Sequence, residues 1–114
     1  MKKKICIILS NYYPEISNNL LLGSMKILKK SKIRNYKKIV VPGVFEIPVV
    51  ISRNINKYDA FVALGCVIKG ETIHFDLITK ATTSAIMDLS ILYKKPIGNG
   101  IVSCMNKKQA LMRS

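Results

Sequence analysis

The sequence is poor in the residues that build metal and disulfide sites. Its 114 residues include one histidine and three cysteines. Cys6, Cys66 and Cys104 are odd in number and no pair has C-x-x-C spacing, which argues against a disulfide framework and against a zinc site. We therefore expect reduced cysteines, with Cys6 and Cys66 as small core residues, and no metal.

Long hydrophobic runs are also missing. No stretch approaches the roughly 18 consecutive apolar residues of a membrane helix. The opening letters MKKKICIIL place lysines before apolar residues, as a signal peptide does, but Ser10, Asn11 and Pro14 end the run before it reaches roughly 7 to 15 residues. We expect a cytoplasmic protein with no membrane partner.

Acidic residues are scarce: six Asp and Glu stand against 19 Lys and Arg, which gives a formal net charge of +13. Such an excess attracts anions and could support loose binding to nucleic acid. The lysines, however, lie at the chain ends and between apolar segments, where solvated helix ends belong, and no basic stripe alternates with aromatic residues. We expect no nucleic-acid partner; a nucleic-acid-binding module is a weaker alternative that requires an affinity falling steeply with salt.

The composition is that of one folded domain over residues 1–114. Hydrophobic residues make up 49% of the chain, which excludes the disordered class. A chain of this length removes roughly two-thirds of its unfolded surface from water. No internal repeat, low-complexity tract or linker divides the sequence.

Apolar β-branched runs alternate with segments of helical period. The runs are apolar at successive positions, as expected of parallel strands covered on both faces. The predicted strands are 4–9, 38–41, 59–68 and 97–104. The predicted helices are 16–31, 46–56 and 73–93, with a further helix beginning near Asn106. This order predicts an α/β domain, a three-layer αβα sandwich around a four-stranded parallel sheet.

Ligands of open parallel sheets bind outside the carboxyl ends of the strands. The loops expected at that edge are 10–15, 42–46, 66–74 and 103–106. Side chains with chemical handles or flat apolar faces occur in the first three of these loops. They are Tyr12, Tyr13, Phe45, Glu46, Thr72 and His74.

His74 is the candidate base. It is expected in the first turn of a helix that begins near Thr72, where the positive end of the helix dipole favours the neutral imidazole. A single histidine at a helix start is more often structural than catalytic, but its place after a strand's carboxyl end favours the catalytic interpretation. The neighbouring letters KGET (69–72) combine a glycine with free N–H groups, which suits phosphate, although Gly70 is equally typical of a simple turn.

Other candidates are ambiguous when taken singly. Tyr12 and Phe45 suit stacking on a planar heterocycle, but aromatic residues beside a parallel sheet are more often core. Glu46 opens a predicted helix, where it gains from the dipole without any ligand. Arg113 has the position of a solvated tail residue.

Three segments together resemble the 6,7-dimethyl-8-ribityllumazine synthase family: VPGVFEIPVV (41–50), ALGCVIKGETIHFD (63–76) and NKKQALMR (106–113). The resemblance runs from about Lys4 to Arg113. It implies a flavodoxin-like topology and the condensation of 5-amino-6-(D-ribitylamino)uracil with 3,4-dihydroxy-2-butanone 4-phosphate, in riboflavin biosynthesis. That reaction releases phosphate and water and uses no cofactor.

The resemblance also implies roles for particular residues. His74 matches the residue that moves protons, and Tyr12 matches the aromatic residue that stacks on the pyrimidine. The other positions matching contacts to the ring and ribityl chain are Val44, Phe45, Glu46, Val67, Ile68 and Asn99. The backbone of Glu71 and Thr72 and the guanidinium of Arg113 match the family's phosphate site.

Two departures from the family pattern lead to further expectations. Asn99 stands where family members have an aromatic residue that a neighbouring subunit lays against the ring. Family members continue beyond the position of Arg113 with a lysine-bearing loop and a long terminal helix. We expect both to be missing here, which would leave an apolar patch uncovered. The resemblance implies a homo-oligomer, a pentamer with active sites between subunits.

Two other functions compete with the enzyme. One is a non-catalytic remnant or ligand-binding scaffold of the same fold, which binds a lumazine but does not turn over. The other, a phosphoacceptor receiver domain, needs acidic residues at the ends of its first and third strands, where this sequence has Ser10 and Cys66.

Overall fold

The computed structural model describes residues 3–71 and 74–114, and within them strands and helices alternate as the sequence predicts. The elements are β1 (Ile5–Ser10), α1 (Pro14–Lys30), β2 (Tyr36–Val41), the 3-10 helix η1 (Val44–Glu46), α2 (Ile47–Asn54), β3 (Ala60–Ile68), α3 (Phe75–Tyr93), β4 (Ile97–Cys104) and α4 (Lys107–Arg113). Most predicted boundaries are displaced by one or two residues, and two of the displaced helix starts lie beside the pocket described below. A 3-10 turn precedes α2, so that helix begins at Ile47, and α3 begins at Phe75 rather than near Thr72.

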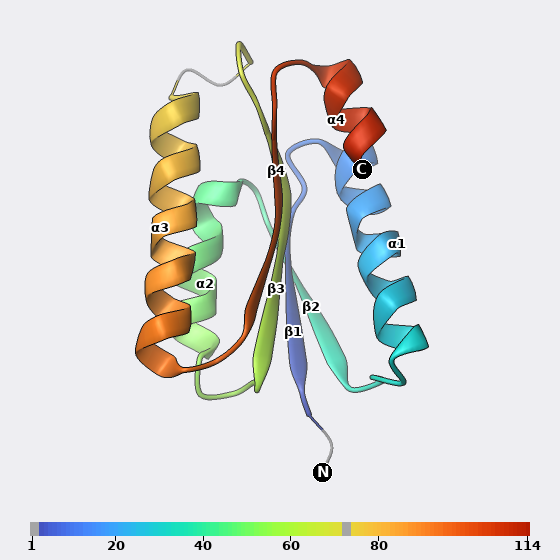
Figure 1. Ribbon diagram of the computed structural model, residues 1–114, viewed down its shortest axis with the longest axis vertical. Helices are drawn as coiled ribbons and strands as arrows, with labels where there is room; N and C mark the ends of the chain where they lie inside the picture. The colour runs from blue at the N-terminus through green and yellow to red at the C-terminus, as the bar shows by residue number, and fades with distance from the viewer. Residues whose placement is uncertain (1–2, 72–73) are drawn as a thin grey trace.

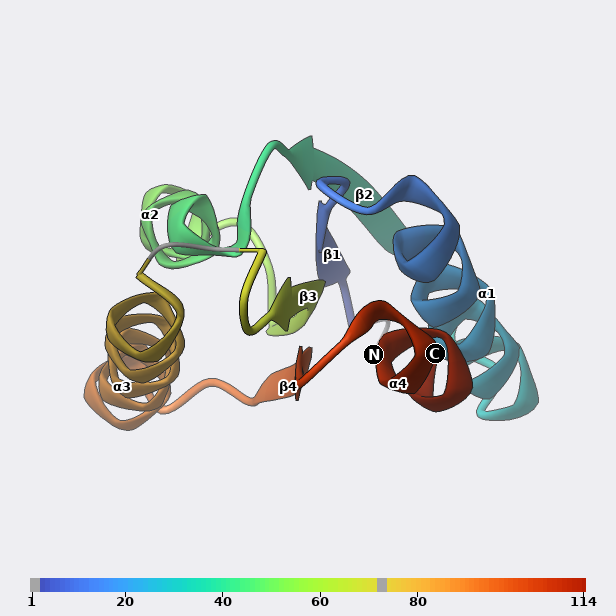
Figure 2. The same cartoon turned by 90° about the horizontal axis from the view of Figure 1, so that it is seen from above.

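The strands form a parallel sheet in the order β2-β1-β3-β4. Helices α1 and α4 lie on one side of the sheet and α2 and α3 on the other (Figures 1 and 2). This confirms the predicted αβα sandwich. Because β1 leads to a helix on one face and β3 to a helix on the other, the strand order reverses between them, and a crevice for a ligand is expected at their carboxyl ends.

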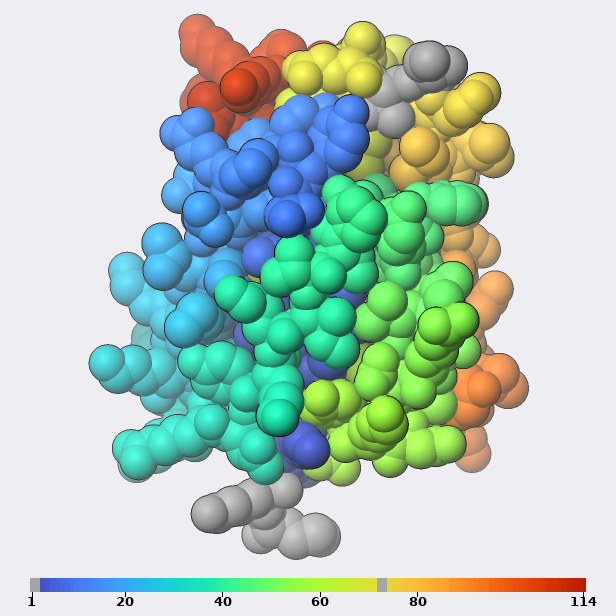
Figure 3. Space-filling model, turned by 180° about the vertical axis from the view of Figure 1, so that it is seen from behind, coloured from blue at the N-terminus to red at the C-terminus, as the bar shows by residue number. Residues whose placement is uncertain are grey.

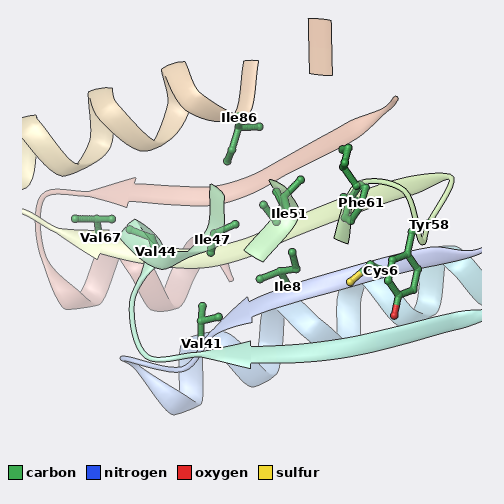
Figure 4. Close-up of a cluster of buried hydrophobic side chains, with 12 residues drawn as sticks. Cys6, Ile8, Val41, Val44, Ile47, Ile51, Tyr58, Phe61, Val67 and Ile86 are labelled. Carbon is green, nitrogen blue, oxygen red and sulfur yellow. The ribbon is translucent and has the colours of Figure 1, made fainter. Parts of the chain in front are cut away.

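The core lies on both faces of β1, which is buried throughout. Cys6 and Ile8 point into a cluster beneath α2 and α3 (Figure 4), whereas Ile7 and Leu9 pack on the α1 side. Burying an isoleucine side chain contributes about 1.5–3 kcal/mol. The predicted core positions of Cys6 and Cys66 are confirmed, and both are free thiols.

Charged side chains stabilise the ends of helices α1 and α2. Helix α1 has Glu15 in its first turn and lysines in its last, which complements the helix dipole. At the other side of the sheet, the Lys95 ammonium donates to the carbonyl oxygens of Ile55 and Tyr58, the latter at 2.9 Å. These bonds tie the approach to β4 to the end of α2, at the edge of the molecule opposite the strands' carboxyl ends.

Helix α3 covers its sheet face with one side only. Its outward side exposes large apolar residues, among them Leu77, Met87, Ile91 and Leu92. Among the described residues, no helix combines the length and the apolar character that crossing a bilayer requires. The exposed side chains of α3 form an apolar surface on the side away from the sheet.

Candidate active site

A pocket of about 450 Å³ opens at the carboxyl ends of the strands. It is walled by the segments that follow β1, β2 and β3. In Figure 3 the blue segment after β1 and the green segment after β2 meet near the upper end of the molecule, below the yellow segment after β3. Its lining residues are Tyr12, Tyr13, Pro42, Gly43, Val44, Phe45, Glu46, Cys66, Val67, Glu71, His74 and Ile78.

The segment after β1 supplies an aromatic wall. Tyr12 is 63% exposed, whereas Tyr13 is half-buried. Their rings meet edge to face, with centroids 4.9 Å apart and planes at 72°. Pro14 opens α1 directly after them, where its missing N–H costs nothing. The wall therefore stands on the first turn of a helix.

The segment after β2 supplies a buried anchor and two exposed side chains. Val44 is buried, while Phe45 is 57% exposed and Glu46 is also exposed. A Cβ atom on Gly43 would lie 2.9 Å from Oε2 of Glu46, so the carboxyl group folds back over a position that glycine leaves open. An aromatic face and a carboxylate thus reach the pocket from one short 3-10 turn.

The segment after β3 carries the histidine. Gly70 has φ +89°, a conformation that favours glycine, and the next amide, that of Glu71, donates to Ile68 O at 3.3 Å. His74 is the N-cap of α3; its carbonyl accepts from Ile78, and its exposed imidazole makes no capping bond. The imidazole ring therefore borders the pocket and does not cap the start of the helix. Thr72 lies outside the described residues.

Cys66 lines the pocket as well, which the sequence analysis missed. Burial raises the pKa of its thiol to about 12, with smaller contributions from Cys104 and from the Glu71 carboxylate. The thiol is thus protonated at neutral pH and is not a nucleophile there. Ile78 was missed too, although its place one turn after His74 is the signal that could have found it.

The family can now be decided from the whole chain. A sequence profile of the family described as 6,7-dimethyl-8-ribityllumazine synthase matches residues 2–114. The chain belongs to this family. A 6,7-dimethyl-8-ribityllumazine synthase of Bartonella tribocorum is 41% identical over 119 residues, which cover 100% of this chain and 78% of the relative. Relatives with the same description from Bartonella bacilliformis (43% identical; 96% and 74% covered) and Methylobacterium radiotolerans (39%; 97% and 68%) are also similar.

One residue matched to a ring contact in lumazine synthases does not line the pocket within one chain. Ile68 is fully buried with Ile16, Cys104 and Ala110 on the α1 and α4 side. Val67, the preceding residue, belongs to the cluster on the α2 and α3 side and does line the pocket. The contact of Ile68 with the heterocycle therefore stays a prediction, and within one chain its side chain is not part of the pocket lining.

Two further residues matched to the lumazine synthase site lie on β4 and α4, outside the pocket. Asn99 is exposed in the middle of β4, where its Oδ1 accepts from Ile101 N at 3.0 Å. The exposed Arg113 donates from Nη1 to Ser103 O at 3.1 Å. One chain by itself does not bring these two side chains to the aromatic wall.

Side-chain hydrogen bonds cap the start of α4, the helix that carries Arg113. The Asn106 side chain accepts from Gln109 N at 2.8 Å, and the Gln109 side chain accepts from Met105 N at 2.8 Å. The first bond satisfies an N–H group that the start of a helix otherwise leaves unpaired, and the second holds the residue before the N-cap. The sequence-predicted helix start near Asn106 is confirmed.

Proposed function

We propose that this pocket condenses 5-amino-6-(D-ribitylamino)uracil with 3,4-dihydroxy-2-butanone 4-phosphate to form 6,7-dimethyl-8-ribityllumazine, a step of riboflavin biosynthesis. Family membership over residues 2–114 supports the proposal. The observation that carries it is convergence: a histidine, exposed aromatic rings and a carboxylate reach one pocket from segments that follow different strands.

The pocket suits a flat, polyhydroxylated substrate. Its volume of about 450 Å³ falls within the range of small-molecule sites, roughly 300–1,000 Å³. Tyr12 and Phe45 are exposed enough to stack on a heterocycle. The Glu46 carboxylate can accept hydrogen bonds from ribityl hydroxyl groups, and Val44 and Val67 close the apolar side.

His74 is the proposed proton-transfer group. The reaction forms a carbon–nitrogen bond between the substrate amine and the ketone with loss of one water, and then eliminates phosphate. The second substrate nitrogen then attacks the remaining carbonyl group and closes the ring with loss of a second water. Each step moves a proton, and a positioned imidazole contributes about 10²–10⁴ in rate. Holding both reactive substrates in contact contributes the rest, because orientation replaces a bimolecular encounter.

The proposed phosphate site combines the backbone of Glu71 and Thr72 with Arg113. The bond from Arg113 to Ser103 uses one of the five N–H donors of the guanidinium. Arginine pairs bidentately with phosphate oxygens and stabilises the charge of a leaving phosphate.

We also propose a cytoplasmic homo-oligomer, a pentamer in which a neighbour completes each site, without nucleic-acid or membrane partners. Asn99 lies away from its own chain's pocket, which is consistent with a role at a neighbouring subunit's pocket. The exposed Leu77, Met87 and Ile91 of α3 offer an apolar surface to another copy.

The test is turnover by the purified protein. With both substrates, we expect lumazine to form faster than in the spontaneous reaction, and His74→Gln to lower kcat by about 10²–10⁴. Thr83→Ala, an exposed position on the same helix, is the matched control. A wild-type rate equal to the background would refute the proposal, and lumazine binding without turnover would identify a ligand-binding protein of the same fold. Sedimentation measurements decide the oligomeric state.

A further inference from the structure

The adjacent tyrosines of the aromatic wall have different environments. Tyr12 is 63% exposed. Tyr13 is half-buried and packs against the apolar cluster between the sheet and the helices α1 and α4. The buried members of that cluster are Ile16, Cys66, Ile68, Cys104 and Ala110. One ring is therefore held by the core, while its neighbour stands in the pocket.

The backbone of Tyr13 is held as firmly as its ring. Its carbonyl accepts from Ser17 N at 2.9 Å, the first bond of α1. Pro14 follows, and a proline restricts the residue before it to extended conformations, such as the φ −116° and ψ 90° found here. The buried Ser17 hydroxyl also donates to Ser10 O, which joins the start of α1 to the end of β1.

Tyr12 has less support of its own. It precedes the helix, most of its surface is exposed, and the edge-to-face contact with Tyr13, at 4.9 Å between centroids, joins it to a ring that the core holds. Both rings border the pocket. An aromatic partner on one side restricts the tilt of an exposed ring, which otherwise samples several rotamers.

We infer that Tyr13 is a positioning residue: its core-anchored ring holds the Tyr12 ring at the angle at which Tyr12 stacks on the flat ring of the substrate. This inference rests on the proposed function. An edge-to-face pair of this kind changes affinity by about two- to tenfold. The effect should appear in binding of the heterocyclic ligand and not in binding of the phosphorylated four-carbon substrate.

The experiment is a double-mutant cycle read by fluorescence titration with 6,7-dimethyl-8-ribityllumazine. Tyr13→Leu should raise the Kd about two- to tenfold, whereas Tyr13→Phe, which keeps the ring edge, should restore wild-type affinity. In a Tyr12→Ala background, Tyr13→Leu should have no further effect, because residues that act through one another are not additive. Tyr36→Leu, a half-buried tyrosine packed on another cluster, controls for loss of any tyrosine.

A second, ligand-free measurement makes the inference testable apart from turnover. In NMR spectra, the ring-current shifts of the Tyr12 protons should collapse in Tyr13→Leu and persist in Tyr13→Phe. An unchanged Tyr12 spectrum, or an additive loss of affinity in the cycle, overturns the inference even if the enzyme turns over. If the wild type neither binds lumazine nor turns over, the proposed function fails, and collapsed Tyr12 shifts then still support the orienting contact. An equal loss of lumazine affinity in Tyr13→Phe and Tyr13→Leu also overturns the inference, because the hydroxyl group and not the ring edge is then responsible.

Discussion

Replacing Gly65 of β3 with alanine tests whether the pocket wall depends on close packing behind it. A Cβ atom at Gly65 would lie 2.6 Å from Cγ1 of Val44 and 3.0 Å from Cβ of Ser10. Ordinary carbon–carbon contacts are about 3.5–4.0 Å, so Val44 must move by roughly 1 Å. Ser10 and Val44 are themselves buried, and overpacking of this kind costs about 1–3 kcal/mol.

The displacement of Val44 should also lower the rate of the proposed reaction. Val44 opens the 3-10 turn that presents Phe45 and Glu46, so a shift of roughly 1 Å moves both side chains and can lower the rate about 10²-fold. We therefore expect Gly65→Ala to lower the urea midpoint by about 1 M, for a slope of about 1–3 kcal/mol per M. It should also lower kcat/KM about ten- to hundredfold.

Gly23 of α1 is the matched control, because an added Cβ there meets nothing within 4 Å. Gly23→Ala in an exposed helix should raise the free energy of unfolding by about 0.5–1 kcal/mol and leave turnover unchanged. Both variants are compared with wild type at equal protomer concentration, since assembly changes apparent stability. Wild-type stability and kcat/KM in Gly65→Ala would refute the packing argument.

Three further changes have defined outcomes. Lys95→Met leaves buried carbonyls without their charged donor and should cost about 1–3 kcal/mol in urea unfolding; no loss would mean that water replaces the ammonium. Asn106→Ala should cost about 1 kcal/mol and, by loosening the helix that bears Arg113, should raise KM for the phosphorylated substrate more than for the pyrimidine. Burial raises the pKa of the Cys6 thiol from 9.0 to about 11, so its contribution to stability is fully present below pH 9 and is lost as the pH rises towards 11. Cys6→Ala should therefore show a shallower decline in unfolding free energy over that range, and an identical decline would contradict the assignment.

Much of the fold could be predicted because its signals are local. Strands buried on both faces need apolar residues at successive positions, as in β3, and a covering helix needs one apolar side at a spacing of three or four, as in α3. The rule that ligands gather at the carboxyl ends of parallel strands then predicts that Tyr12, Phe45 and His74 lie together. The structure confirms that these three border one pocket.

Boundaries and orientations were less predictable. Val44, which opens the 3-10 turn before α2, packs closely against Gly65, and Gly70, which precedes α3, has a positive φ. Neither is visible in hydrophobic spacing, which reports which side of an element is buried but not where its last turn ends.

The sequence by itself determined the order of the elements, the parallel sheet and the edge at which a ligand is expected, because these follow from chain-local periodicity and from rules common to all such sheets. Only the tertiary structure decided which neighbouring side chains share the pocket. It buried Val67 and Ile68 in clusters on opposite faces of the sheet, set the rings of Tyr12 and Tyr13 edge to face, and left Arg113 on α4 outside the pocket. These choices depend on contacts between segments far apart in the chain, which no local pattern contains.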